Sequence, residues 1–374
     1  MIQALDVKNI VLLGDLHFGK NKFSKTTLES QLDFFNNQLF DYMKENECST
    51  IIQVGDIFDN RISVDIEYLQ NIMVKFFDVL KEKNITFICI VGNHDIYHKS
   101  TREYTLLNII QRLYSNVILI NERREILINN KRCYFVPWIL PSETLTSDEL
   151  TGINYVFGHF EIRNFEMTKG HLDDHSLLSP EFFKKKKSLK KVYSGHYHIK
   201  AEKDTITYLG TPYWLDWGDY GTDRGFFLLD SDFKEKFISN TESIKFIKLK
   251  YSDKNVKPLT ISGLTDKDID ITCEEIVEYA DRLRKHKLKL FINYSSDNKH
   301  EEYIYTLKQN SLEFEITNNV EISNIIGESY IDNNINTSVP SSSRTLIKDT
   351  VKKKNNALIP ILEELFRELE EINV

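Results

Sequence analysis

Five apolar runs in the first 200 residues each end at a short motif rich in aspartate, asparagine and histidine, and this pattern constrains the fold more than any other feature of the chain. Short apolar runs that end at glycine or aspartate indicate buried strands. Open α/β sheets place their sites beyond the carboxyl ends of the strands, so all five motifs are expected to meet at one site. In chain order the motifs are Asp15-Leu16-His17, Gly55-Asp56-Ile57-Phe58-Asp59, Gly92-Asn93-His94-Asp95, Gly158-His159 and Gly195-His196-Tyr197-His198.

The segments between the first motifs have the periodicity of helices. Apolar residues recur at helical spacing over residues 28–42, behind the capping pattern Thr26-x-x-Glu29, and again over residues 69–80. Such a stripe predicts an amphipathic helix packed on a sheet. The strands themselves are expected at residues 10–13, 50–54, 85–91, 155–157 and 192–194.

The second half of the chain is expected to form further parts. Short strands at 205–209 and 225–229 indicate a second, strand-rich sheet. Strands and helices that alternate from 247 to 317 indicate a small α/β accessory domain, and the Ser- and Pro-containing stretch at 333–343 is the best linker candidate. The predicted division is therefore residues 1–248, 249–332, the linker 333–343 and a helical tail at 344–374.

The tail carries one apolar stripe, which must be buried somewhere. Docking of this helix on a partner is favoured because a linker precedes it, and packing on the chain's own core is the alternative. The candidate contact residues are Leu362, Leu365, Phe366 and Leu369.

Composition excludes several classes of protein. The chain lacks an apolar run of about 20 residues and a visible signal peptide, so we expect no membrane association and a cytoplasmic location, in the host cytoplasm if the source is viral. The four scattered cysteines form no C-x-x-C pair, which excludes a typical thiolate zinc site. A net charge of −8 argues against a strongly basic, freestanding nucleic-acid binder, but not against DNA as a substrate, because bound cations attract phosphate.

The residue types in the motifs suit two divalent cations. Two cations about 3.5–4 Å apart need a bridging anion, and Asp56, at the end of a predicted strand, is the candidate. Asp15 and His17 lie two residues apart in a loop and can bind one ion together. Asn93 offers a neutral carbonyl oxygen, which binds metal without adding negative charge that would repel phosphate.

The later histidines and His94 complete the predicted chemistry. His196 and His198 are also two residues apart and can address both ions. Asp, Asn and His ligands without cysteine favour Mn²⁺ or Fe²⁺ over a thiolate zinc site. Mn²⁺ is the expected metal, with Mg²⁺ or Fe²⁺ as alternatives. His94 is the best candidate to protonate the leaving oxygen or to stabilise its charge, so His94 and Asp56 are the expected catalytic residues.

The series D-x-H, GD-x-x-D, GNHD, GH and GHxH, over about residues 9 to 200, resembles the calcineurin-like metallophosphoesterases. GNHD, in place of GNHE, resembles the nuclease branch of that superfamily, and the accessory segment and tail are similar to the SbcD-type nuclease subunits of double-strand-break repair complexes, including those of phages. The resemblance implies a four-layer αββα sandwich with a small α/β cap domain at about 249–332 and a C-terminal helical tail.

The resemblance also implies roles for individual residues. It implies a two-metal, Mn²⁺-dependent DNA exonuclease and endonuclease that works in recombination, replication and repair. The implied partners are DNA, which the cap helps to position, and an SbcC-type ATPase with a long coiled coil, which the tail grips; a homodimer is left open. Asp15, His17, Asp56 and His198 would hold one ion, and Asp56, Asn93, His159 and His196 the other, with His94 assisting cleavage.

One position departs from the family pattern. Many relatives carry a histidine where this chain has Asp59, which puts any role of that position in positioning DNA in doubt. Asp59 is expected instead to hold a neighbouring histidine or Arg61, and Asp95 to support the ligands from beside them. The expected DNA contacts are Arg61 and the basic run Lys184, Lys185, Lys186 and Lys187, for which a solvated loop is the alternative.

A DNA nuclease is thus the leading hypothesis. A phosphomonoesterase or nucleotide hydrolase of the same superfamily is an alternative, since the ligand set permits it. A non-catalytic scaffold with the same fold is an alternative of another class, but such proteins usually lose ligands, and every expected ligand is present here.

Overall fold

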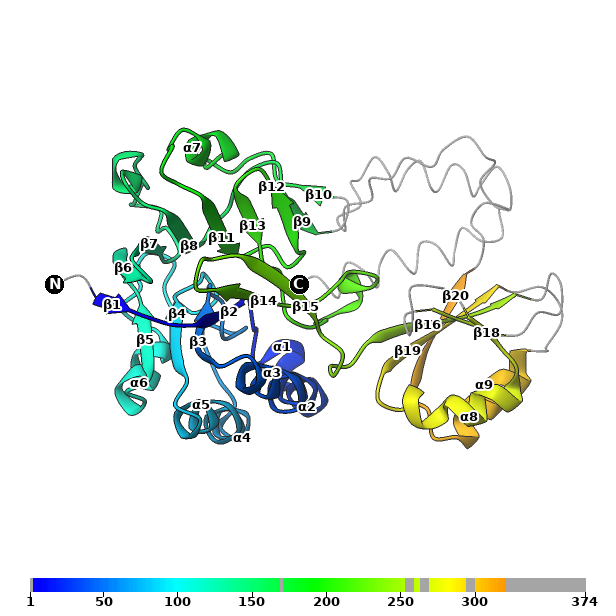
Figure 1. Ribbon diagram of the computed structural model, residues 1–374. Helices are drawn as coiled ribbons and strands as arrows, with labels where there is room; N and C mark the ends of the chain where they lie inside the picture. The colour runs from blue at the N-terminus through cyan, green and yellow to red at the C-terminus, as the bar shows by residue number, and fades with distance from the viewer. Residues whose placement is uncertain (1–2, 169–170, 253–258, 263–268, 294–299, 320–374) are drawn as a thin grey trace, which may run out of the picture. The chain divides into compact units, whose positions relative to one another are not determined.

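The computed structural model describes residues 3–168, 171–252, 259–262, 269–293 and 300–319 (Figure 1). These residues belong to one compact unit, Met1–Asn319. The predicted linker 333–343 and the predicted tail 344–374, with its four partner-contact residues, lie outside the described residues. Among the residues that are described, no helix is long and apolar enough to cross a membrane.

A six-stranded sheet carries the first three motifs. Its strands β2, β3, β4 and β5 run parallel, so their carboxyl ends lie at one edge. Residues 10–13 are fully buried, as expected for a strand of a parallel sheet that is covered on both faces. The strand order is β15 (Glu235–Ser239), β14 (Gly225–Asp230), β2 (Asn9–Leu13), β3 (Cys48–Gln53), β4 (Thr86–Ile90) and β5 (Val117–Ile120).

A seven-stranded sheet carries the last two motifs. Strands β8, β11 and β13 are parallel neighbours in it, so they too bring their carboxyl ends to one edge. The two sheets share a core in which Ile52 and Ile90 from one sheet meet Phe135, Phe157 and Tyr193 from the other. The strand order is β1 (Gln3–Leu5), β6 (Arg124–Ile128), β7 (Lys131–Val136), β8 (Tyr155–His159), β11 (Lys191–Gly195), β13 (Ile206–Tyr208) and β12 (Ala201–Lys203).

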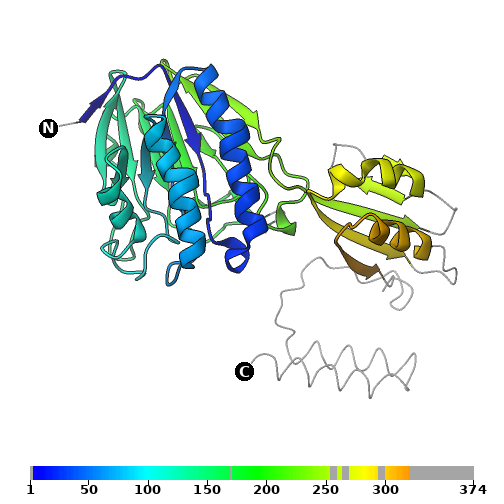
Figure 2. The ribbon, with the colours of Figure 1, turned by 90° about the horizontal axis from the view of Figure 1, so that it is seen from below.

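Helices cover the outer face of the six-stranded sheet, as Figure 2 shows. Their apolar faces pack on it around Phe34, Phe35 and Phe76. The first long helix begins after Ser24, whose side chain accepts from the backbone N–H of Thr27, so the predicted cap at Thr26 was wrong by two residues. The helical segments are α1 (Lys20–Phe23), α2 (Lys25–Phe34), η1 (Phe35–Leu39), α3 (Phe40–Glu45), α4 (Ile66–Ile72), η2 (Met73–Phe77), α5 (Asp78–Glu82) and α6 (Leu106–Leu113).

The outer face of the seven-stranded sheet has a thinner cover. Loop residues such as Leu150 and Phe160 pack there beside Phe183 of the short helix α7 (Pro180–Lys184). A 3₁₀ turn, η3 (Asp148–Leu150), and a two-stranded hairpin, β9 (Glu166–Thr168) and β10 (His171–Leu172), complete this side. The predicted four-layer α/β class is confirmed, although loops form most of the fourth layer.

The strand-rich second sheet predicted after residue 205 was wrong in its connections. Strand β13 adds to the seven-stranded sheet beside β11, whereas β14 pairs antiparallel with β2 of the six-stranded sheet. The strands after residue 205 therefore extend the two existing sheets. Two sheets, and not one, supply the five motifs.

A separate five-stranded sheet lies in the predicted cap. Its inner face packs Leu249 and Leu290 against Ile276 and Leu283 of α8 and Leu307 of α9. The sequence pattern missed its two short strands, β17 and β18. The strand order is β18 (Ile269–Ile271), β17 (Leu259–Ser262), β16 (Phe246–Ser252), β19 (Lys287–Asn293) and β20 (Phe314–Asn319), and the helices are α8 (Cys273–Leu283) and α9 (His300–Gln309).

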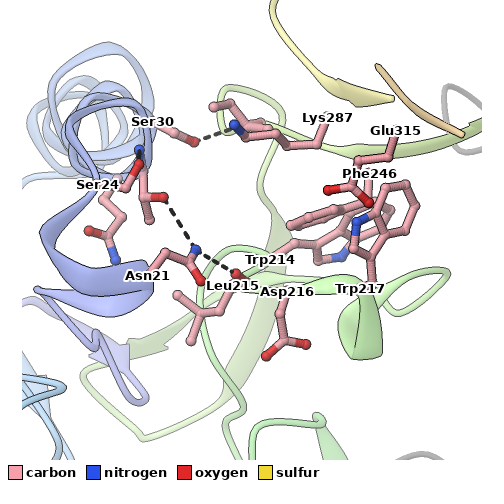
Figure 3. A pocket seen from close by; sticks show the side chains of 13 residues that line it. Asn21, Ser24, Ser30, Trp214, Leu215, Asp216, Trp217, Phe246, Lys287 and Glu315 are labelled. Carbon is pink, nitrogen blue, oxygen red and sulfur yellow. Dashed lines mark hydrogen bonds between the residues drawn. The ribbon is translucent and has the colours of Figure 1, made fainter. Parts of the chain in front are cut away.

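A pocket of about 330 Å³ lies beside the first strand of this sheet (Figure 3). Ser24 and Ser30 line it from α2 and the turn before it, and Trp214 and Trp217 line it from the loop that contains the 3₁₀ turn η4 (Trp217–Asp219). Phe246 closes it from β16. The loop 211–224 thus reaches the cap sheet.

Candidate metal centre

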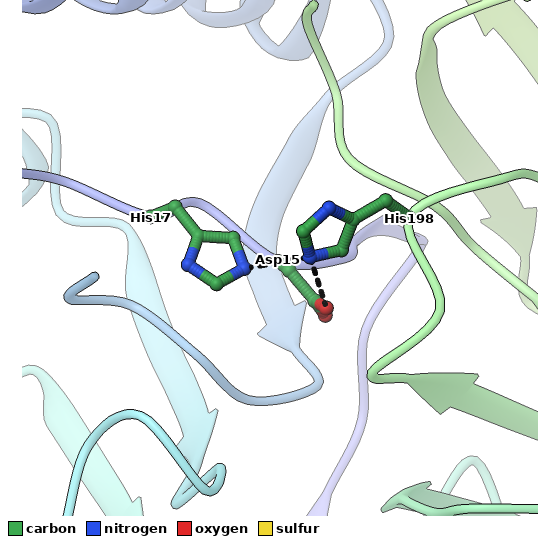
Figure 4. A group of neighbouring side chains, drawn as sticks. All are labelled: Asp15, His17 and His198. Atoms are coloured by element: carbon green, nitrogen blue, oxygen red, sulfur yellow. Dashed lines mark hydrogen bonds and ion pairs between the residues drawn. The ribbon is translucent and has the colours of Figure 1, made fainter. Parts of the chain in front are cut away.

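The first group of candidate ligands is Asp15, His17 and His198, which come from both sheets (Figure 4). The Nε2 atoms of His17 and His198 are 2.9 Å apart, and His198 Nε2 lies 4.0 Å from Asp15 Oδ2. Asp15 and His17 are fully buried, whereas His198 is half-buried. Three ligand atoms therefore converge on one point below the surface.

The second group is built around Asn93, whose side-chain oxygen lies 2.9 Å from His159 Nε2 and 3.0 Å from His196 Nδ1. His159 Nε2 is also 3.2 Å from Asp56 Oδ2. The predicted ligand Asn93 thus sits between two predicted histidine ligands. Asp56, His159 and His196 themselves form a group whose ligand atoms lie within 4.8 Å of one another.

Asp56 is placed between the two groups. Its Oδ2 atom is 3.2 Å from His159 Nε2 in the second group and 3.9 Å from His17 Nε2 in the first. This is the position that a bridging carboxylate requires.

The spacing and the chemistry of these atoms fit divalent cations. Atoms that bind one ion at about 2.1 Å and at right angles stand about 3 Å apart, which is the spacing seen around Asn93 and between His17 and His198. Imidazole, carboxylate and amide oxygen are ligands that Mn²⁺ and Fe²⁺ accept. All seven predicted ligands therefore lie where two neighbouring ions could share them.

Unusual backbone conformations put the ligands in place. His17, Asp56 and His196 have positive φ angles of 46°, 57° and 87°, which side-chain-bearing residues rarely adopt. The backbone N–H of His17 donates to the Asp56 carbonyl at 3.0 Å, which ties the first two motifs together. At Gly55, with φ of 107°, a Cβ atom would lie 2.2 Å from His159 Nδ1, so the second motif requires glycine there.

Asp95, predicted to support the ligands, holds the turn that carries Asp56. Its carboxylate accepts backbone N–H groups from Asp56, Ile57, Phe58 and Gly92 at 2.9 to 3.1 Å. The Asp95 side chain is buried, so these four N–H groups depend on its carboxylate as their acceptor. Asp95 thereby fixes the second and third motifs to each other.

Two of the candidate histidines, His159 and His196, have a second partner that orients the ring. His159 Nδ1 contacts the Val54 carbonyl at 2.8 Å, so its Nε2 faces Asn93 and Asp56. His196 Nε2 lies 3.2 Å from Glu161 Oε1, which leaves Nδ1 for the second group. Such outer partners fix the tautomer of metal-binding histidines. Glu161 was not predicted, although it lies two residues after His159 in the fourth motif.

Asp59 contacts two histidines. Its Oδ1 atom lies 3.1 Å from His17 Nδ1, and its carbonyl is 2.7 Å from His94 Nδ1. Of the two partners expected for Asp59, a histidine is therefore present, and Lys20 Nζ is a further neighbour at 3.7 Å. The rings of His94 and His17 are 5.0 Å apart, so His94 stands beside the first group.

The charges in the centre are strongly interdependent. Burial raises the pKa of Asp15 well above its usual range. Burial would do the same to Asp56, but the charge and hydrogen bond of His159 hold the pKa of Asp56 well below its usual range. Asp56 in turn overcomes the effect of burial on His159 and raises the pKa of His159 to about 9. A cation that binds here must therefore displace protons.

The predicted DNA contacts lie in two different places. Arg61 lines an open groove of about 790 Å³ together with His94. The run Lys184–Lys187 lies at the amino-terminal ends of β8, β11 and β13, because Lys184 Nζ is 3.5 Å from Asp204 Oδ1 and Lys186 Nζ donates to Thr151 Oγ1 at 3.2 Å. The ligands follow the carboxyl ends of these strands, so the structure does not bring the lysines to the centre.

Several supporting residues were missed by sequence reasoning. Trp138 packs beside His196, with ring centres 5.1 Å apart. Tyr197, between two predicted ligands, donates to Asp173 at 2.5 Å, and Arg224 donates to the carbonyl of His198. No local motif marks these residues, since their partners lie 24 or more positions away in the chain.

Comparison with known proteins agrees with this geometry. Residues 8–200, about half of the chain, match the model of the calcineurin-like phosphoesterase family. The chain therefore belongs to the calcineurin-like phosphoesterases, and it is a divalent-metal-dependent phosphoesterase.

One relative, a phage protein, extends the similarity beyond that region, and two archaeal relatives match shorter stretches of the chain. Exonuclease subunit 1 of Enterobacteria phage T4 is 30% identical over 238 residues, which cover 62% of this chain and 67% of the phage protein. The DNA double-strand break repair protein Mre11 of Sulfolobus acidocaldarius is 31% identical over 117 residues, or 29% of this chain and 30% of the archaeal protein. The DNA double-strand break repair protein Mre11 of Saccharolobus solfataricus is 26% identical over 130 residues, or 35% of this chain and 33% of the archaeal protein.

Proposed function

We propose that this protein is a DNA nuclease that hydrolyses phosphodiester bonds with two divalent ions, as exonuclease and endonuclease, in recombination, replication and repair. The observation that carries the proposal is the pair of ligand groups joined by Asp56, with His94 beside them. The relatives support the choice of substrate, since one is named as an exonuclease subunit and the others as double-strand break repair proteins.

The bound ions would supply a nucleophile at neutral pH and neutralise charge on the phosphate. Asp15, His17, Asp56 and His198 would hold one ion, and Asp56, Asn93, His159 and His196 the other. The ligand set, which contains no thiolate, favours Mn²⁺ or Fe²⁺ over a zinc site of the thiolate type. We propose Mn²⁺ as the metal, with Mg²⁺ or Fe²⁺ as alternatives. Asn93 adds no charge at the point where the phosphate must approach.

His94 is proposed to act on the leaving oxygen. Its Nδ1 atom faces the Asp59 carbonyl at 2.7 Å, and a carbonyl can only accept, so Nδ1 carries a hydrogen. Nε2 is then left for the substrate, and the imidazolium form can donate a proton from it. The backbone N–H of His94 donates to Asp56 Oδ1 at 2.7 Å, which keeps the ring in register with the bridging carboxylate.

The proposal is tested with linear duplex DNA and Mn²⁺. Asp56→Asn and His94→Ala should each lose at least about 100-fold in cleavage rate, but only Asp56→Asn should also lose metal binding in a calorimetric titration. Asp232→Asn and His175→Ala, which alter exposed residues of the same types, are the matched controls. Equal cleavage by all five proteins would refute the assignment.

A comparison of substrates separates the nuclease from a phosphomonoesterase. A diesterase should turn over bis-p-nitrophenyl phosphate faster than p-nitrophenyl phosphate, and the reverse preference would favour a nucleotide hydrolase. Both substrates carry the same leaving group, so the ratio reports on diester preference.

We further propose two protein partners and a location. An SbcC-type coiled-coil ATPase would bind the tail, and the phage relative, named as one subunit of an exonuclease, supports a multi-subunit assembly. A second copy of the chain would bind exposed apolar side chains on α6 and at the start of α4, since Ile109, Leu113 and Ile66 are 57% to 82% exposed. The protein would act in the cytoplasm, where its DNA substrate is accessible.

A further inference from the structure

The segment 211–224 touches both the metal centre and the cap sheet. On the cap side, the ring of Phe246 lies 5.0 Å from that of Trp217 and 6.0 Å from that of Trp214 (Figure 3). Lys289 Nζ lies 4.6 Å from the centre of the Trp217 ring, and Lys248 Nζ lies 4.0 Å from that of Tyr220. An edge-on ring contact, a tilted ring contact and two cations over rings are the contacts that attach strands β16 and β19 to this segment.

The other side of the segment holds the backbone around the first ligand group. The hydroxyl of Tyr213 donates to the Leu16 carbonyl at 2.7 Å, between Asp15 and His17. Arg224 donates to the carbonyl of His198, which also accepts the backbone N–H of Thr211 at 3.1 Å. Both stretches of chain that supply the first group are thus fixed from this one segment.

A buried ion pair connects the two sides. Arg224 and Asp219 are only 5% and 6% exposed, and Arg224 Nη2 donates to Asp219 Oδ1 at 2.7 Å. The other carboxylate oxygen of Asp219 accepts the backbone N–H of Leu215 at 2.7 Å, within the turn that carries the tryptophans. The guanidinium therefore joins the aromatic turn to His198 through a planar fork that lysine cannot reproduce.

We propose that Arg224 is a positioning residue that couples the cap to the first metal-ligand group. In the arrangement seen here, the aromatic turn, Asp219, Arg224 and the His198 backbone form one continuous hydrogen-bonded path. Metal on Asp15, His17 and His198 then stabilises the docked cap, and the docked cap raises the affinity for that metal, because coupling between two sites is reciprocal. This inference rests on the proposed metal role of the first group.

Tryptophan emission provides a direct readout of the coupling. The chain has three tryptophans, and Trp138 lies beside the second group, so Trp138→Phe leaves Trp214 and Trp217 as reporters of the cap junction. Mg²⁺, which is not a paramagnetic quencher, is titrated into this protein while emission and heat are recorded. The heat should show two binding events, and the change in tryptophan emission should have the same midpoint as one of them.

The variants test the path from each end. Arg224→Lys should weaken that one site about tenfold, leave the other unchanged and abolish the emission change, since loss of an outer partner typically costs 10- to 100-fold in metal affinity. Trp217→Ala, on the half-buried cap side, should weaken the same site and tests the coupling even if Arg224→Lys does not fold. Arg123→Lys, which alters a partly buried pair of Arg123 and Glu149 elsewhere in the protein, should change neither readout.

Three results would overturn the inference: wild-type affinity in Arg224→Lys, wild-type affinity in Trp217→Ala, or reporters that stay silent while metal binds. All three results leave the proposed nuclease function intact. If the wild-type protein, which keeps Trp138, binds no metal at all, both proposals are refuted together.

Discussion

At the scale of single residues, the centre depends on groups that never touch substrate. Asp95 accepts four backbone N–H groups, one from Gly92 and three from the turn of residues 56–58. Burial and the nearby Asp56 charge raise the pKa of Asp95 to about 6, which is tolerated because those donors favour the charged form. The last residue of the GNHD motif thus stabilises the turn of the second motif, which carries Asp56.

Asp95→Asn should destabilise the protein by about 2 kcal/mol, because the amide replaces one accepting oxygen with a donor that faces buried N–H groups. The melting temperature should fall, and metal affinity should fall with it, since the turn of Asp56 loses its support. Asp232→Asn, in an exposed turn, is the control for the chemistry of the substitution. An unchanged melting temperature in Asp95→Asn would contradict this role.

The sequence could identify the ligands but not the residues that hold them. His159 and Asn93 were predictable because each follows a buried strand, and the carboxyl ends of parallel strands meet. Tyr213 and Arg224 donate to backbone carbonyls that lie 197 and 26 positions away. Every residue has a backbone carbonyl, so no residue type in the sequence marks these partners. The positive φ angle of His17 was equally invisible, since no glycine marks it.

At the scale of elements, the two long helices show what periodicity misses. Residues 28–42 were predicted to pack one apolar face on the core, and Tyr42 does contact that core, but it is half-buried and the fully buried residue beside it is Met43. The π-helical turn η1, Phe35–Leu39, adds a residue to that turn and advances the stripe by one position. Regular 3.6-residue spacing cannot represent such an insertion.

Stability of the cap should depend on pH through His286. Burial, reinforced by the charges of Lys245 and Arg282, lowers the pKa of His286 to about 4, and its Nδ1 accepts the backbone N–H of Lys245 at 3.2 Å. The unfolded chain, with an ordinary pKa near 6.5, binds the proton more tightly, so this contribution is full above pH 6.5 and is lost as pH falls towards 4.

Urea denaturation between pH 7 and 4.5 measures this effect. The wild type should lose roughly 2 kcal/mol more than His286→Asn over that range. His98→Asn, which alters an exposed histidine, should keep the wild-type slope. If His286→Asn shows the same pH dependence as the wild type, His286 does not carry it.

The exposed face of α6 bears on the proposed homodimer. Ile109 and Leu113 on this helix are 57% and 58% exposed, and Ile66 at the start of α4 is 82% exposed. A two-fold interface uses the same patch on both copies. A substitution that adds a charge to the patch therefore places two like charges in the interface. Ile109→Lys should therefore convert a dimer into a monomer in sedimentation experiments, whereas Val277→Lys, at a similarly exposed apolar residue of α8, should not. A wild type that sediments as a monomer would remove this surface from consideration.

At the scale of the whole molecule, the metal centre alone does not define the substrate. The same ligand groups could serve a small phosphate ester, and only the cap, the groove beside His94 and the tail distinguish a nuclease from a phosphatase. The unit Met1–Asn319 contains the centre, the groove and the cap sheet. Loss of the tail should therefore separate assembly from chemistry.

Deletion of residues 344–374 should abolish association with an SbcC-type ATPase while cleavage of short duplexes stays within about twofold of the full chain. The sequence of the tail motivates this expectation, because its apolar stripe needs a surface to cover it and follows a Ser/Pro-containing stretch. Co-purification from cells that express both proteins measures the association. Serine at the stripe residues Leu362, Leu365, Phe366 and Leu369 should reproduce the deletion, and serine at Glu363, Arg367 and Glu370 should not. If the truncated chain still co-purifies with the ATPase, the partner binds elsewhere, and the stripe must pack on the chain's own core.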